Sequence, residues 1–291
     1  MGEILHMRSR EIHFPRRPLI MGIVNINDDS FSGDGRVDVD WAIEYSRQQV
    51  ADGADIVDIG AESARTNRDA ISEEEEKRRL IPFVKRFQEV WKDSAPCDAQ
   101  QIWPPLLSVN TWRSPVARAV LAEGGDILND MSGLPTEENA RICAETRAAL
   151  LIMHTMGQPK VPHTHVQYGN VMEDILQFFK SKMELAKGAG ISPRQIILDP
   201  GLDFAKQGED NLRIIRELEK LHSLNRPILL PLSRKSFIGK TQGIENPLDR
   251  DAATVACLVI GQLRGAAIFR MHNVKAARQA LATLEMVESS S

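Results

Sequence analysis

The sequence lacks most of the features that mark secreted, membrane-spanning and nucleic-acid-binding proteins. Its three cysteines, Cys97, Cys143 and Cys257, are odd in number and far apart, so they form neither a disulfide framework nor a metal-binding motif. The 36 basic and 40 acidic residues leave a net charge of −4, which argues against a nucleic-acid partner. No apolar run approaches the roughly 18 residues of a membrane span, and the N-terminus has no apolar signal-peptide core. We therefore expect a cytoplasmic protein with no membrane and no nucleic-acid partner.

A glycine-rich dinucleotide-binding motif is also missing after the first predicted strand. The chain instead alternates short apolar runs with longer amphipathic segments. The apolar runs predict β-strands at residues 19–25, 54–60, 105–109, 126–130, 149–154, 195–201, 228–232 and 266–272. The segments between them predict helices at residues 40–51, 72–91, 115–123, 137–147, 171–186, 211–224 and 247–264, with a last helix after Asn273. Continuous apolar strands are typical of a parallel sheet, and eight βα units over about 250 residues favour an α/β (β/α)8 TIM barrel.

One domain is expected, with short extensions at both ends. Residues 1–18 are basic and contain Pro15 and Pro18, so they are predicted to form a peripheral N-terminal arm. Residues 19–287 are the predicted barrel. The serine-rich residues 288–291 are expected to fray.

Polar side chains follow almost every predicted strand. In (β/α)8 barrels the chemistry lies at these carboxyl ends, and the residues found there are Asn25, Glu62, Asn110, Asn129, His154, Asp199, Lys235, Arg270 and His272. Each has a simple structural explanation: Asp199 can begin a turn, His154 is favoured as a core histidine, and residues 233–236 can be a solvated basic turn. Gathered in one barrel mouth, however, these groups must pair with each other or with a ligand.

The types of side chain indicate the kind of ligand. Amides and one carboxylate match a planar heterocycle that both donates and accepts hydrogen bonds, and Lys235 and Arg270 can bond to or stack on such a ring. Arg65 in the second loop is available to a phosphate. Asn25 and the acidic loop after it offer oxygen ligands to Mg²⁺, although that loop can equally be a solvated turn. A zinc site that includes His163 and His165 is the less favoured explanation of the long loop there.

Six segments in the expected order resemble dihydropteroate synthase, a family of pterin-binding barrels. They are residues 21–32, 58–65, 129–130, 199–201, 233–239 and 270–272. The resemblance implies a transferase of folate biosynthesis. It would join 4-aminobenzoate to 6-hydroxymethyl-7,8-dihydropterin pyrophosphate and release pyrophosphate, with Mg²⁺ as cofactor. It also implies a homodimer formed through the late helices, and residues 252–263 are apolar enough for such an interface.

The resemblance also assigns roles to matching positions. It implies that Lys235, Asn110 and Arg270 serve catalysis, and that Asn25 ligates Mg²⁺. The implied substrate-binding residues are Asn129 and Asp199 at the pterin edge, Lys235 at its ring, Arg270, His272 and Arg65 at the pyrophosphate, Phe204, Lys235 and Ser236 around the aminobenzoate, and Ala64 in the second loop.

The sequence departs from the family pattern at several of these places. Asn110 stands where the family has aspartate, Asp203 where it has glycine, and Ala64 where it has threonine. The alternatives are therefore a pterin-binding paralogue with weak, lost or changed activity, for example a methyl-folate methyltransferase, and an aldolase-like barrel with Lys235 as a Schiff-base lysine. A binding or scaffold protein without enzymatic activity is a further alternative.

Overall fold

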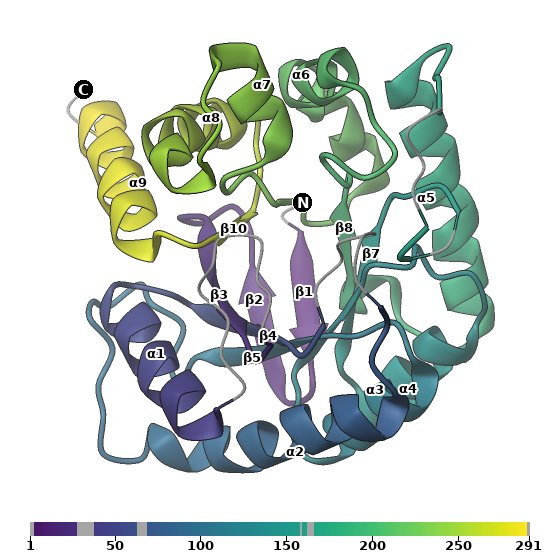
Figure 1. Cartoon of the computed structure of the whole chain (residues 1–291), viewed down its shortest axis with the longest axis vertical. Helices are drawn as coiled ribbons and strands as arrows, with labels where there is room; N and C mark the ends of the chain where they lie inside the picture. Colours follow the sequence, from purple (N-terminus) through teal and green to yellow (C-terminus); the bar gives the residue numbers. More distant parts are fainter. Residues whose placement is uncertain (1–2, 28–37, 63–68, 158, 162–165, 290–291) are drawn as a thin grey trace.

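The computed structural model describes all residues except 1–2, 28–37, 63–68, 158, 162–165 and 290–291. Eight parallel strands form the sheet, in the order β8-β7-β6-β5-β4-β3-β10-β9. A bridge between Leu198 and Ile228 joins the two ends of this order, and helices surround the ring (Figure 1). The chain therefore folds as the predicted (β/α)8 barrel.

The elements follow one another as strand and helix along the chain. The barrel strands are β3 (Leu19–Asn25), β4 (Ile56–Gly60), β5 (Leu106–Asn110), β6 (Ile127–Asp130), β7 (Ala149–Met153), β8 (Ile196–Asp199), β9 (Leu229–Leu230) and β10 (Ile268–Met271). The helices are α1 (Val39–Ala51), α2 (Glu73–Val90), α3 (Ser114–Ala122), α4 (Glu138–Thr146), α5 (Val171–Gly188), α6 (Gly208–Arg216), α7 (Ser236–Gln242), α8 (Asp251–Leu263) and α9 (Val274–Ser289). Short 3-10 helices cover Pro193–Gln195, Leu218–Leu224 and Pro247–Arg250.

Along most strands, the side chains that point into the barrel change from apolar to polar. Alternate residues of a strand face the same side, so Ile56, Asp58 and Gly60 of β4 face inward together. The first inward residues, such as Ile56, Leu106 and Ile127, pack in an apolar cluster. On most strands the inward residues two or four positions later are polar, such as Asp58 and Asn110, whereas β7 stays apolar through Met153. This places hydrogen-bonding groups at the carboxyl ends of most strands.

The N-terminal residues differ from the peripheral arm that was predicted. They form an antiparallel hairpin of β1 (Ile4–Met7) and β2 (Arg10–His13), drawn in purple across the centre of the ring in Figure 1. Leu5, Met7 and Ile12 are buried against the apolar cluster at the amino-terminal ends of the strands. The hairpin thus covers the end of the barrel opposite to the polar side chains. Alternating apolar residues between the arginines are the sequence signal for it.

Two predicted elements are shorter or differently divided. The strand expected at residues 228–232 has only two residues in β9, because Pro227 before it and Pro231 within it have no N–H to continue the ladder. The helix expected at residues 211–224 begins at Gly208 and ends at Arg216, and a 3-10 helix follows it. At the C-terminus α9 continues through Ser289, although fraying was expected to begin at residue 288.

Candidate active site

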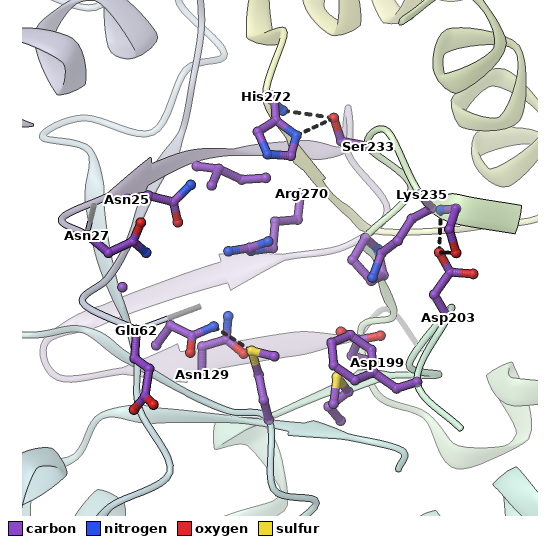
Figure 2. Close-up of a pocket in the computed structure, with 18 residues that line it drawn as sticks. Asn25, Asn27, Glu62, Asn129, Asp199, Asp203, Ser233, Lys235, Arg270 and His272 are labelled. Carbon is purple, nitrogen blue, oxygen red and sulfur yellow. Dashed lines mark hydrogen bonds between the residues drawn. The ribbon is translucent and has the colours of Figure 1, made fainter. Parts of the chain in front are cut away.

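A cavity of about 280 Å³ opens at the carboxyl ends of the strands. Its lining includes nine of the predicted site residues, namely Asn25, Asn110, Asn129, Asp199, Phe204, Lys235, Ser236, Arg270 and His272. Figure 2 shows the labelled ones among them, such as Asn25, Asn129 and Arg270, pointing into one space. The parallel barrel therefore brings together residues that lie up to 247 positions apart in the sequence (272 − 25).

The floor of the cavity is organised around Asp58, a carboxylate that is 0% exposed. It accepts hydrogen bonds from Nε of Arg270 at 2.7 Å and from Oγ of Ser108 at 2.6 Å. Nδ2 of Asn129 donates to both of its oxygens, at 3.2 and 3.3 Å. Since Arg270 and Asn129 both line the cavity, Asp58 holds two of its polar groups in place.

Asp199, at the end of β8, presents a second carboxylate to the cavity. It is 4% exposed, and its Oδ1 accepts from the backbone N–H of Gly201 at 2.7 Å. Burial raises the pKa of Asp199 from 3.8 to about 6, against the opposing effect of that hydrogen bond and of Lys235. Gly201 has a φ of +68°, and a Cβ there would lie 2.0 Å from the carbonyl oxygen of His154. Only glycine fits this turn, which aims Asp199 into the cavity.

Lys235 and Phe204 lie against each other on one side of the cavity. Nζ of Lys235 lies 4.6 Å from the centre of the Phe204 ring and donates to the carbonyl oxygen of Leu202 at 2.9 Å. Burial lowers the pKa of Lys235, and the carboxylates of Asp203 and Asp199 oppose this shift. The lysine is therefore oriented by an aromatic face and a carbonyl group.

Asp203 joins the two loops that carry Phe204 and Lys235. Its Oδ2 accepts from the backbone N–H of Ser236 at 2.5 Å and from Oγ of Ser236 at 2.9 Å. Its Oδ1 accepts from the N–H of Phe237 at 3.3 Å. Figure 2 shows this carboxylate beside the backbone after Lys235.

The remaining cavity walls are formed by residues at the ends of the first, third and eighth barrel strands. Nδ1 of His272 lies 2.8 Å from Oγ of Ser233, which fixes the ring (Figure 2). Asn110 is 7% exposed and its Nδ2 donates to Sδ of Met131 at 2.8 Å. Asn25 and Asn27 lie together on one side of the cavity, with Glu62 below them in Figure 2.

Two predicted strand-end residues have structural roles. His154 is 1% exposed and does not line the cavity, as expected for a core histidine. Its Nδ1 lies 2.9 Å from Nζ of Lys206, and burial lowers the pKa of His154 to about 2. Glu62 lines the cavity but is paired with Arg113 at 2.7 Å and with Lys160 at 3.0 Å.

Some predictions concern residues that the structure does not describe. Ala64, Arg65, His163 and His165 lie outside the described residues. Within the described part of the chain there is no group of three or more His, Cys, Asp or Glu side chains able to hold a metal ion. In the same part, no helix is long and apolar enough to cross a membrane.

The comparisons with known proteins agree with this geometry. The model of the family "Pterin binding enzyme" matches residues 21–272. The chain belongs to the dihydropteroate synthase family of pterin-binding enzymes. A dihydropteroate synthase of Synechocystis is 36% identical over 266 residues, which cover 91% of this chain and 88% of the relative. The resemblance seen in the six sequence segments is therefore confirmed.

Solved structures of dihydropteroate synthases share the whole fold. The enzyme of Xanthomonas albilineans with 4-aminobenzoic acid has a TM-score of 0.85 at 32% identity, with 100% of each chain covered. The enzyme of Burkholderia cenocepacia complexed with 7,8-dihydropteroate has a TM-score of 0.84 at 30% identity, covering 99% of this chain and 97% of that one.

Asp58 and Lys206, which support the cavity without lining it, were not predicted as site residues, and neither were the lining residues Asn27, Met131 and Asp203. Asp58 lies inside an apolar strand. An ionisable residue at a position that faces the barrel interior is the sequence feature that could have identified it. Lys206 lies in a polar loop with no such signal. Burial lowers the pKa of Lys206 to about 7, and its Nζ donates to the carbonyl oxygens of His154 at 3.3 Å and Phe204 at 3.0 Å. It therefore fixes the loop that carries Phe204 against β7.

Proposed function

We propose that this protein is a dihydropteroate synthase, a transferase that joins 4-aminobenzoate to 6-hydroxymethyl-7,8-dihydropterin pyrophosphate. The observation that carries the proposal is the polar floor of the cavity, where Asp199, Asn129 and the Asp58–Arg270 pair converge. An apolar pocket with a few fixed polar groups is the usual form of a site for a small planar ligand. Relatives of similar length that carry this activity support the choice.

The pterin is proposed to lie on this floor. The ionised Asp199 accepts hydrogen bonds from the N–H groups of the pterin edge, and Asn129 can donate and accept beside it. Lys235 donates to the ring oxygen and nitrogen, and the guanidinium of Arg270 stacks on the ring. Asp58 keeps Arg270 in that orientation. These roles follow from the side-chain types and from the family resemblance.

The pyrophosphate and the aminobenzoate are proposed to occupy opposite sides of the mouth. Arg270 and His272 offer hydrogen-bond donors to the pyrophosphate, with Arg65 as a further partner. Phe204, Lys235 and Ser236 surround the aminobenzoate ring on the other side. The two substrates then meet at the methylene carbon of the pterin.

A magnesium ion fits the donors present on the pyrophosphate side. Mg²⁺ takes oxygen ligands and is commonly held by few protein groups together with substrate phosphates. The amides of Asn25 and Asn27 offer such oxygens within one part of the cavity lining, and Asn25 is the proposed ligand. When bound, the ion would neutralise negative charge on the leaving pyrophosphate.

The reaction requires positioning rather than a covalent enzyme intermediate. The C–O bond between the methylene carbon and pyrophosphate breaks, and both electrons leave with pyrophosphate. The arylamine nitrogen forms the new C–N bond and releases a proton. The enzyme contributes by aligning the two substrates and by stabilising the separated charges.

The protein is further proposed to act as a cytoplasmic homodimer. Its three cysteines are free thiols, which supports a reducing compartment. Helix α8 carries Ile260 and Leu263, 46% and 58% exposed, and α9 carries Met286 and Val287, 68% and 69% exposed. The two helices pack together in Figure 1. Their exposed apolar residues favour an interface with a second copy.

The test combines purified protein, pterin pyrophosphate, Mg²⁺ and labelled 4-aminobenzoate. Formation of dihydropteroate with one equivalent of pyrophosphate, abolished by a chelator and restored by Mg²⁺, is the expected result. Pterin binding without product would instead favour the paralogue with changed activity, which the asparagine at position 110 motivates. Borohydride trapping of Lys235 with a carbonyl substrate would favour the aldolase-like alternative.

A further inference from the structure

The loop between β8 and α6 contains a carboxylate at a position where the backbone favours glycine. Asp203 has a φ of +68°, in the left-handed region that few side chains adopt without cost. The conformation is held by several bonds, including one from the N–H of Asp203 to Oδ1 of Asn211 at 2.7 Å. A strained residue that lines a cavity and is fixed on all sides is a candidate for a functional role.

The carboxylate of Asp203 accepts hydrogen bonds from donors on the side of the cavity proposed for the aminobenzoate. The two backbone N–H groups and the hydroxyl that it accepts from belong to Ser236 and Phe237. Ser236 lines the cavity together with Phe204 and Lys235. Lys235 itself donates to the carbonyl oxygen of Leu202. Two backbone N–H groups and one hydroxyl that could otherwise receive a ligand carboxylate here are therefore engaged by Asp203.

A second negative charge in this place would also be repelled. Like charges brought together in a partly desolvated pocket weaken binding strongly, and Asp203 is half-buried. An uncharged substituent on the arylamine would avoid both the repulsion and the competition for donors. Discrimination of this kind arises as much from what a site disfavours as from what it attracts.

We infer that Asp203 is a specificity-determining residue, which weakens binding of arylamines with a carboxylate relative to uncharged arylamines of the same shape. The inference rests on the proposed function for the identity of the second substrate. It concerns only the relative preference, because both kinds of arylamine offer the same nucleophilic nitrogen.

The experiment compares 4-aminobenzoate with 4-aminobenzamide, its uncharged analogue, in the intact enzyme and two variants. Asp203→Asn removes the charge and keeps an acceptor, and asparagine tolerates a positive φ. Asp203→Gly removes the whole side chain and suits the backbone still better. The control is Glu209→Gln, because Glu209 is an exposed carboxylate in the first turn of α6 that does not line the cavity.

In both Asp203 variants the ratio of kcat/KM for 4-aminobenzoate to kcat/KM for 4-aminobenzamide should rise by about tenfold or more. The rise should come mainly from a lower KM for 4-aminobenzoate. Glu209→Gln should leave the ratio unchanged. If both substrates change by the same factor in the Asp203 variants, the residue only stabilises the loop and the inference is wrong.

Calorimetric binding of the same two arylamines separates this result from the proposed function. Absence of turnover in every variant would contradict the proposed function, while a selective gain in 4-aminobenzoate affinity would still support the role of Asp203. If the enzyme is active but the ratio of the two arylamine affinities is the same in the Asp203 variants as in the unaltered protein, only the role of Asp203 is overturned. Absence of binding of either arylamine would also overturn that role.

Discussion

Nε of Arg270 donates to Oδ2 of Asp58 at 2.7 Å, across the floor of the candidate active site. Asp58 is fully buried, whereas the Arg270 side chain is 23% exposed. The Arg270 guanidinium is thus exposed to the cavity, while the balancing carboxylate of Asp58 is buried beneath the cavity floor. A buried ion pair with further hydrogen bonds is well suited to fix the orientation of its side chains, because breaking it leaves a buried charge without a partner.

Replacing Asp58 by asparagine should therefore lower kcat/KM. One charge-assisted contact is lost, so we expect a decrease of roughly ten- to a hundredfold, measured by steady-state kinetics. Asp130→Asn is a matched control, because Asp130 is equally buried on β6 but bonds to Ser132 and Asn139, neither of which lines the cavity. Equal losses in the two variants would mean that Asp58 acts only through stability.

Replacing Asn110 by aspartate should leave activity equal or higher. A carboxylate at this position restores the family's residue and adds a negative charge that favours a cationic pterin methylene. Initial rates under saturating and limiting pterin pyrophosphate check this. A collapse of turnover in Asn110→Asp would show that the cavity, with Met131 against Asn110, is adapted to another reaction.

Replacing Asp199 by asparagine should stabilise the protein while it impairs pterin binding. The pKa of Asp199 is raised from 3.8 to about 6, so the folded protein holds this proton more tightly than the unfolded chain. The favourable contribution is complete below about pH 4 and is lost as the pH rises through 6. Ionised Asp199 then costs roughly 3 kcal/mol of stability, which the neutral amide avoids.

The measurement is the free energy of unfolding of both proteins at pH 4, 6 and 8. The advantage of Asp199→Asn should be largest at pH 8 and close to zero at pH 4. Pterin affinity of the unaltered protein should also fall as the pH drops below about 6, since the ionised carboxylate is the acceptor. A stability difference independent of pH would contradict this account.

The proposed dimer should dissociate when charges are placed on α8. In Ile260→Glu with Leu263→Glu, two exposed apolar side chains become like charges that face their counterparts across a two-fold axis. Sedimentation should then shift from twice 32.5 kDa to one chain of 32.5 kDa. Leu212→Glu on α6, where Leu212 is 37% exposed, is the control and should stay dimeric. A monomeric unaltered protein would contradict the proposed interface.

Most of the fold and many site residues could be predicted because their signals are local. Continuous apolar runs at residues 19–25 and 149–154 are readable as buried strands, and a polar residue after each run marks a strand end. The N-terminal hairpin was missed because its apolar alternation is only four residues long in each strand. The short β9 was overestimated because its prolines removed donors from an otherwise strand-like segment.

The sequence by itself determined the alternation of strands and helices, the polar strand ends and the family to which they point. Only the tertiary structure decided how those side chains pair. Asp58 and Arg270 are 212 positions apart, and Asp203 reaches Ser236 across two loops. Such contacts depend on barrel closure and strand register, which bring distant residues within hydrogen-bond distance and which no local pattern encodes.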